Sequence, residues 1–163
     1  MSPESPANHP QSPAVPEPER PSGGAVSVGI VLVSHSRALA EAAMDLARRL
    51  IVAVDVPVEL AAGLADGGLG TDPGAVVEAV ERLAERCEGV LVLADLGSGI
   101  MSAEMALEML EPALAERTRL SAAPFVEGLL GAYGAAGIGK DLQAVAAEAD
   151  GAAEAKRSQV AAF

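Results

Sequence analysis

The chain of 163 residues has one cysteine, no tryptophan and only three aromatic residues. The single cysteine, Cys87, excludes an intramolecular disulfide, and its place near a predicted helix end suggests a small buried apolar residue. Half of the residues are hydrophobic, so with so few aromatics the core must consist of Ala, Val, Leu and Met. The longest apolar run, Val26–Val33, is far too short to span a bilayer.

Basic residues are also scarce, with 11 Lys and Arg against 23 Asp and Glu and a formal net charge of −12. No basic cluster stands out against this background, which argues against binding to nucleic acid and against adsorption to anionic lipid. No charged-then-apolar leader opens the chain, so we expect a cytoplasmic protein without a membrane partner.

Proline is concentrated at the beginning of the chain, where residues 1–25 hold seven of the eleven prolines and almost nothing apolar. Such a segment buries too little surface to offset its ordering entropy, so we predict a disordered tail. A second disordered tail is predicted for residues 151–163, a stretch of Ala with Glu, Lys and Ser among them. Residues 26–150 remain as one domain, long enough to bury a hydrophobic core.

Apolar runs alternate with helical patterns along this domain. The runs that predict strands are Val26–Val33, Val56–Ala62, Gly89–Asp95 and Arg119–Ala123. Three of them are continuous, which is typical of parallel strands that are covered on both faces. Asp72 and Pro73 predict a helix start, and Pro112 should end another helix. The order predicts an α/β fold with an open, mainly parallel sheet and helices on both faces, in which ligands bind beyond the carboxyl ends of the strands.

His35 lies at such a position, after the first predicted strand and before the first helix, whereas the other histidine, His9, is in the proline-rich tail. A helix amino terminus disfavours the imidazolium ion, and it favours a dianionic phosphoryl group by about 0.3–1 kcal/mol. His35 is therefore the candidate phosphoryl-accepting nucleophile. Ser36 either contacts the phosphoryl group or only caps the helix. The alternative is that His35 merely satisfies a buried carbonyl.

The run Asp95–Gly99 closes the third predicted strand and supplies the other half of the candidate site. We expect the Asp95 carboxylate to accept one ring N–H of His35 and so to fix its tautomer. Gly97 would let the backbone approach a bound phosphate, and Ser98 would donate to its oxygens. The alternative is a strand-to-helix turn that needs glycine only for its dihedral angles.

Two glycine-rich stretches imitate nucleotide-binding motifs without completing them. Gly97–Ser102 resembles a dinucleotide fingerprint, but it lies on the third strand, and no convincing acidic residue follows about 20 positions later. Gly134–Asp141 is one residue short of a P-loop and has Asp141 where Ser or Thr would bind magnesium, so a glycine turn between two helices is expected. We predict no cofactor and no metal site of the chain's own.

Two further patterns leave alternatives open. In the loop 63–72, Gly67 and Gly68 are expected to lie in a flexible surface segment. Gly70 and Thr71 either belong to the same surface loop or face the His35 site. Met101, Met105 and Met109 recur at helical spacing. Such a row is usually core filler, although its softness would also suit a dimer or docking surface.

Four stretches together resemble one family. They are Val31–Ser36, Gly70–Asp72, Asp95–Ser98 followed by Ser102–Glu108, and Ala123–Gly128. The family is the phosphotransferase subunit (DhaM) of phosphoenolpyruvate-dependent dihydroxyacetone kinase and, more broadly, the mannose-type enzyme IIA domain. The resemblance spans about residues 26–150, and its specificity comes from the four motifs in order at the family's spacing.

The resemblance implies that His35 takes a phosphoryl group from phospho-HPr and passes it to ADP on the nucleotide-binding subunit of dihydroxyacetone kinase. The chain would then be one component of a phosphoenolpyruvate–glycerone phosphotransferase, with ADP held by the partner and a homodimer as its assembly. In this interpretation Asp95 orients His35, Ser98 and Gly97 contact the phosphoryl group, and Thr71 lines the site.

The chain also departs from the family pattern. Many members carry HPr-like and enzyme-I-like domains after this one, whereas this sequence ends at Phe163, so we expect a separate HPr or a tail that is the stub of a linker. Two other functions stay open. One is a regulatory module in which the phosphorylation state of His35 controls a partner protein, and the other is a nicotinamide- or nucleotide-binding protein.

Overall fold

The computed structural model describes residues 26–163, and in this part strands and helices alternate as the sequence predicts. The elements are β1 (Val26–Ser34), α1 (Arg37–Leu50), β2 (Val58–Ala62), α2 (Pro73–Ala84), β3 (Cys87–Ala94), α3 (Gly97–Met109), α4 (Pro112–Ala115), β4 (Thr118–Ser121), α5 (Phe125–Gly137), α6 (Leu142–Asp150) and α7 (Ala152–Ala161). The predicted disorder of residues 1–25 lies outside the described residues.

The sheet has four strands in the order β2-β1-β3-β4, and every pairing is parallel. β1 lies between β2 and β3, so the chain adds β2 on one side of β1 and then crosses to the other side to form β3. The register pairs Val33 of β1 with Ala94 of β3. The residues that follow, His35 and Asp95, therefore leave the sheet side by side at its carboxyl edge, where such folds bind ligands.

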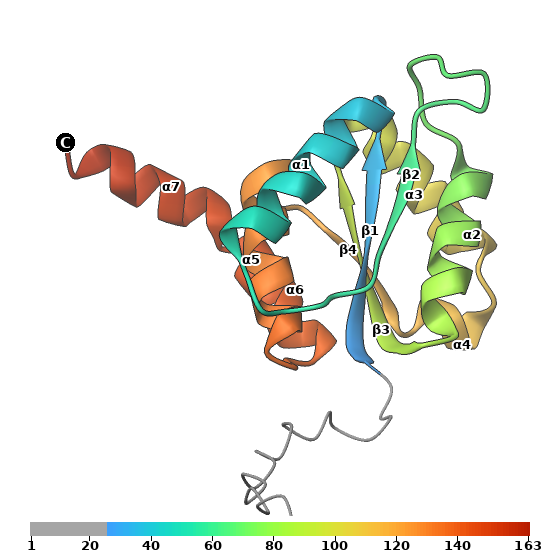
Figure 1. Cartoon of the computed structure of the whole chain (residues 1–163). Coiled ribbons are helices and arrows are strands. Elements are labelled where there is room, and N and C mark those ends of the chain that lie inside the picture. The colour runs from blue at the N-terminus through green and yellow to red at the C-terminus, as the bar shows by residue number, and fades with distance from the viewer. Residues whose placement is uncertain (1–25) are drawn as a thin grey trace, which may run out of the picture.

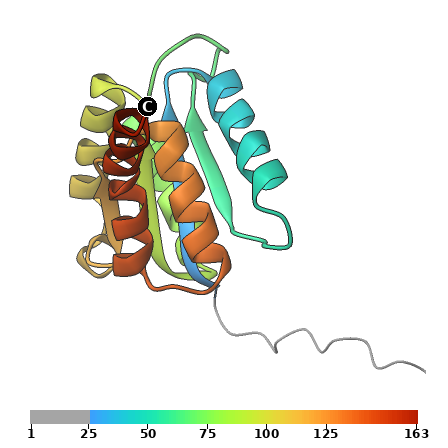
Figure 2. The same cartoon turned by 90° about the vertical axis from the view of Figure 1, so that its left-hand side faces the viewer.

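Helices cover both faces of the sheet, which confirms the predicted fold class (Figures 1 and 2). One face packs against α1, α5 and α6, and the other packs against α2 and α3. Successive side chains of β1 pack alternately into the hydrophobic layers on the two faces of the sheet, because strand residues alternate in direction. Ile30 and Leu32 enter the first layer, Val31 and Val33 enter the second, and all four are fully buried.

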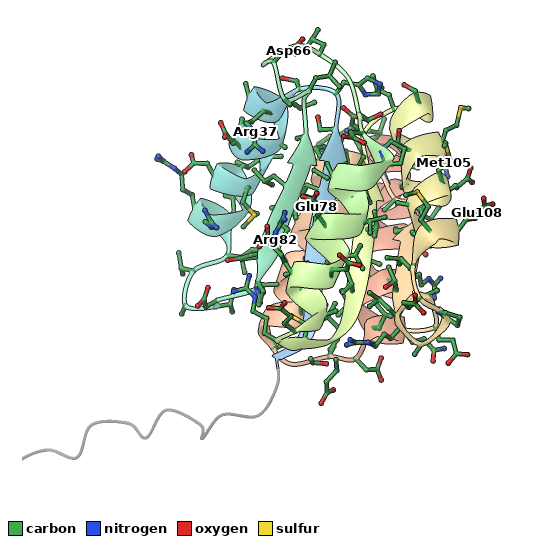
Figure 3. The ribbon with its side chains drawn as sticks, turned by 90° about the vertical axis from the view of Figure 1, so that its right-hand side faces the viewer. Arg37, Asp66, Glu78, Arg82, Met105 and Glu108 are labelled. Atoms are coloured by element: carbon green, nitrogen blue, oxygen red, sulfur yellow. The ribbon has the colours of Figure 1, made fainter. Side chains whose placement is uncertain are left out.

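α2 has the amphipathic pattern of a helix that lies on a sheet. The Asp72 side chain accepts a hydrogen bond from the Gly74 N–H, and Pro73 is the first helical residue, as predicted. Glu78 and Arg82 lie on its outer side (Figure 3). The residues that it buries are Val76, Ala79, Val80 and Leu83.

Two predicted helix boundaries are confirmed. α3 ends at Met109 and α4 begins at Pro112, because proline cannot continue the preceding helix. The run Gly134–Asp141 contains the expected glycine turn rather than a P-loop: α5 ends at Gly137, Gly139 has a positive φ, and Asp141 caps α6 by accepting the Ala144 N–H. Cys87 is also buried as predicted, at the first position of β3.

The prediction of disorder for residues 151–163 is wrong, because Ala152–Ala161 form helix α7. Its Ala, Glu, Lys, Arg and Gln residues are strong helix formers, and Gly151 between α6 and α7 keeps helical dihedral angles. A composition of this kind is found both in disordered tails and in solvent-exposed helices, so it does not distinguish between them. None of its residues is buried, and Figure 1 shows α7 extending away from the sheet. No helix in the described part of the chain is long and apolar enough to cross a membrane.

Candidate functional site

The candidate site lies where β1 and β3 end. The His35 ring contacts two residues of the β3–α3 junction: Nδ1 lies 2.9 Å from Asp95 Oδ1, and Nε2 lies 2.5 Å from Ser98 Oγ. The His35 side chain is 25% exposed and that of Asp95 only 5%, so the imidazole opens to solvent above a buried carboxylate. The structure therefore brings together His35, Asp95 and Ser98 as the sequence predicts.

The Asp95 carboxylate is held by four hydrogen bonds. Oδ1 accepts from the Leu96 N–H and from His35 Nδ1, and Oδ2 accepts from the Ser34 hydroxyl and the His35 N–H, at 2.7–2.9 Å. Burial by itself would raise the pKa of Asp95, but these hydrogen bonds outweigh it and lower the pKa below its ordinary value. Asp95 is therefore ionised at neutral pH, which places the ring proton on Nδ1 and leaves a lone pair on Nε2.

Nε2 faces the amino terminus of α3. Ser98, in the first turn of that helix, donates its hydroxyl hydrogen to Nε2. The N-cap residue Leu96 offers no side-chain hydrogen bond to the first-turn N–H groups, whereas Ser36, Asp72 and Asp141 cap α1, α2 and α6. Uncapped N–H groups and the positive end of the helix dipole favour an anion at this position.

Two glycines of α3 leave room around the imidazole. A Cβ atom on Gly97 would meet no atom within 4 Å, so the space beside its backbone is open. A Cβ atom on Gly99 would lie 3.0 Å from Asp95 Oδ1 and 3.7 Å from His35 Cε1. Gly99 is therefore needed for the close approach of α3 to the His35–Asp95 pair.

Thr71 joins the site indirectly. The Gly70 N–H donates to the His35 carbonyl oxygen at 2.9 Å, which ties the loop to the end of β1. The Thr71 hydroxyl lies 2.8 Å from Ser102 Oγ and 3.5 Å from the carbonyl oxygen of Ser98. Thr71 thus contacts α3 beneath the residue that touches Nε2, and it makes no hydrogen bond to the imidazole.

Ser36 is the N-cap of α1, since its hydroxyl oxygen accepts the Leu39 N–H at 3.3 Å. Its side chain makes no hydrogen bond to the ring of His35. Two further serines support the site: the Ser34 hydroxyl donates to Asp95 Oδ2, and Ser102 Oγ lies beside the Thr71 hydroxyl. The sequence pointed to Ser34 as a hydroxyl that flanks His35, but not to Ser102. Ser34 could be recognised from the sequence because a polar residue ends a continuous apolar strand directly before His35.

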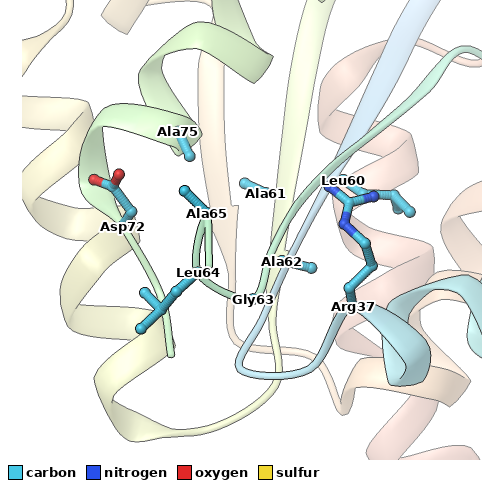
Figure 4. Close-up of a pocket in the computed structure, with 9 residues that line it drawn as sticks. All are labelled: Arg37, Leu60, Ala61, Ala62, Gly63, Leu64, Ala65, Asp72 and Ala75. Atoms are coloured by element: carbon cyan, nitrogen blue, oxygen red, sulfur yellow. The ribbon is translucent and has the colours of Figure 1, made fainter. Parts of the chain in front are cut away.

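A cavity of about 310 Å³ lies beside the site, between the ends of β2, α1 and α2 (Figure 4). It is lined by Arg37, Asp72 and the turn at Gly63, but not by His35. Both charged side chains already have partners: Arg37 pairs with Glu41, and Asp72 caps α2. Among residues 26–163, no cluster of three or more His, Cys, Asp and Glu side chains is arranged to hold a metal ion.

Comparison with known proteins assigns the chain to a family. The sequence model of the family described as PTS system fructose IIA component (EIIA-man) matches residues 29–146. The chain belongs to this EIIA-man family. The match lies inside the domain predicted at residues 26–150, and it includes the whole His35–Asp95–Ser98 arrangement.

Curated relatives carry the name predicted from the four motifs. The phosphoryl donor subunit DhaM of the PEP-dependent dihydroxyacetone kinase of Escherichia coli K12 is 44% identical over 135 residues, and that of Klebsiella michiganensis is 43% identical. These alignments cover 82% of this EIIA-man chain and only 28% of each relative. DhaM of dihydroxyacetone kinase 2 from Listeria innocua is 36% identical, with 62% of this chain and 79% of the relative covered.

A solved structure shares the fold. The crystal structure of the unknown function protein EF1359 matches with a TM-score of 0.69 and 31% identity, over 76% of this EIIA-man chain and 93% of that chain. The likeness supports the arrangement of strands and helices described above.

Proposed function

We propose that this EIIA-man domain is a phosphohistidine carrier that serves a dihydroxyacetone kinase. In this proposal His35 accepts a phosphoryl group from phospho-HPr and transfers it to ADP on the nucleotide-binding subunit of the kinase. The observation that carries the proposal is that ionised Asp95 holds Nδ1, while Nε2 keeps its lone pair beside the uncapped amino terminus of α3. The names of the relatives support the same role.

Loading begins when the Nε2 lone pair attacks phosphorus and the bond to the donor breaks, with its electron pair remaining on the donor. Because Nδ1 keeps its proton, the ring gains positive charge, which the Asp95 carboxylate stabilises at 2.9 Å. The phosphoryl oxygens then lie near the Ser98 hydroxyl and the open backbone of Gly97. The chain therefore supplies the nucleophile, and it adds orientation and electrostatic stabilisation.

Discharge reverses these events. An oxygen of the ADP β-phosphate attacks phosphorus, and the electron pair of the breaking P–N bond returns to Nε2. The protonated ring is a good leaving group because it departs as neutral imidazole. ADP stays on the partner subunit, so the chain needs no cofactor of its own.

The remaining assignments stay predictions. Ser98 and Gly97 lie where the phosphoryl group would be, and Thr71 supports the backbone of Ser98. Ser36 accepts the cap hydrogen bond with its oxygen, which leaves its hydroxyl hydrogen free to donate. The homodimer, the cytoplasmic location and the assignment as a phosphoenolpyruvate–glycerone phosphotransferase component belong to the same proposal.

Phosphorylation of the purified chain tests the proposal. Phosphoenolpyruvate, enzyme I and HPr should add a single acid-labile group of about 80 Da to the wild type and to His9→Ala, but none to His35→Ala. Addition of the nucleotide-binding kinase subunit with ADP should then remove the group and form ATP. Retention of the group on His35 in the presence of that subunit would instead favour the regulatory module.

A further inference from the structure

The outer face of α3 has an unusual distribution of side chains. The helix buries only small residues: Gly99, Ser102, Ala103 and Ala106. Its large apolar residues lie outside instead, and they form what we name the α3 face: Leu96, Ile100, Met101, Met105 and Met109, which are 40–63% exposed. In Figure 3 Met105 lies on the outer side of α3, away from the sheet. The methionine row is therefore not core filler.

This arrangement costs free energy in the isolated chain. The hydrophobic effect favours burial of Met and Leu over Ala and Ser, and contiguous exposed apolar residues mark interaction sites. Methionine is flexible and polarisable, so a row of it adapts to the surface that covers it. The α3 face is thus built to be covered by another surface.

The α3 face begins at the reactive imidazole. Leu96 directly follows Asp95, and Ser98, which contacts Nε2, is in the first turn of the same helix. A protein that covers the face from Leu96 to Met105 therefore also reaches the opening above Nε2. A phosphoryl donor must reach Nε2 at the Ser98 end of the ring, because Asp95 holds Nδ1.

Charge decides what chemistry the covering surface has. Glu104, Glu108 and Glu111 are exposed beside the α3 face, and none of them forms an ion pair with the residues that the structure describes. Residues 97–116 contain no Lys or Arg. Two copies of α3 packed together would bring six such carboxylates close to one another without a cation from either helix. A partner with Lys or Arg around an apolar centre fits the surface instead.

We propose that the α3 face is the docking surface for the phosphoryl donor, a protein that presents its phosphorylated side chain within an apolar patch rimmed by basic residues. This inference rests on the proposed carrier function and assigns a partner surface to the same site. Docking on α3 places the donor phosphorus over Nε2, while contacts with the glutamates offset the repulsion between a dianion and a chain of net charge −12.

The test measures the initial rate of His35 phosphorylation as a function of phospho-HPr concentration. The double variant Met101→Glu, Met105→Glu should raise KM roughly tenfold or more and change kcat less than about twofold. Val52→Glu is the matched control, since Val52 is 73% exposed in the loop after α1, at the opposite edge of the sheet. It should change neither constant. Thermal unfolding followed by circular dichroism checks that both variants are folded.

A charge variant provides a second measurement. Glu104→Lys, Glu108→Lys should also raise KM, and it should weaken the dependence of KM on salt concentration. Unchanged KM in both double variants would overturn the docking surface while leaving the carrier function intact. Conversion of a dimer to a monomer with unchanged KM would assign the face to a second copy, and a defect only with the kinase subunit would assign it to the acceptor. Failure of wild type to accept phosphate would refute carrier function and docking together.

Discussion

α2 and α3 lie side by side on the same face of the sheet, yet they are built in opposite ways. α2 buries large side chains such as Val80 and Leu83 and exposes charged ones, and its amino terminus is closed by Asp72. α3 buries Gly, Ser and Ala, exposes methionines, and leaves its amino terminus without a side-chain cap. The first helix is thus organised for stability. In our proposals the second gives up part of that stability to contact a phosphoryl group and a partner protein.

The largest expected difference between the two helices concerns the aspartates before them. Asp95→Asn should slow His35 phosphorylation by about 10²–10⁴-fold, because an amide neither fixes the Nδ1–H tautomer nor stabilises positive charge on the ring. Asp72→Asn should leave the rate unchanged within about twofold, since Asn is an equally good N-cap. Rates from rapid-quench mass spectrometry measure both. Equal loss in the two variants would show that Asp95 acts only as a structural residue.

The next difference concerns stability. Leu83→Ala in α2 should lower the free energy of unfolding by about 2–5 kcal/mol, because it leaves a cavity in the core. Met105→Ala in α3 should change it by no more than about 0.5 kcal/mol, since Met105 is 54% exposed. Urea unfolding followed by circular dichroism measures both values. A large loss for Met105→Ala would mean that the methionine row already packs within the isolated chain.

A smaller effect is expected at the glycine in the first turn of each helix. Gly97→Ala should slow phosphorylation roughly tenfold by filling the space predicted for the phosphoryl group, while the free energy of unfolding stays within about 1 kcal/mol of wild type. Gly74→Ala brings a Cβ atom to 3.3 Å from Asp72 Oδ1 and should leave the rate unchanged. A normal rate in Gly97→Ala would remove Gly97 from the phosphoryl-binding residues.

The smallest effect is expected in the pH dependence of stability. The pKa of Asp95 is lower in the folded chain than its ordinary value of 3.8, so its carboxylate stabilises the fold above that value. This contribution is lost as the pH falls through the lowered folded pKa. The free energy of unfolding of Asp95→Asn should therefore approach that of wild type in acid, and the difference between the two should grow as the pH rises. Parallel curves for Asp95→Asn would contradict the assigned hydrogen bonds.

Much of the fold and half of the site followed from the sequence. Continuous apolar runs predicted the parallel strands, and strand ends meet at one edge, so His35 and Asp95 were predicted to pair. The support from Ser102 to Thr71 depended on the length and direction of short side chains, which no pattern specifies. The exposed position of Met105 could not be predicted, because α3 has both small and large apolar residues around it and helical spacing alone does not say which stripe packs inward. For α7, the composition suited a tail and a helix equally.

The Asp95 carboxylate accepts two hydrogen bonds from His35, one from the main-chain N–H to Oδ2 and one from ring Nδ1 to Oδ1. The His35 side chain therefore loses its conformational entropy once, when the chain folds, and does not lose it again each time another protein binds. In the proposed carrier function, a brief, weak complex is then sufficient to align the reacting groups. His35 can then exchange partner proteins rapidly while its ring keeps the orientation that transfer requires.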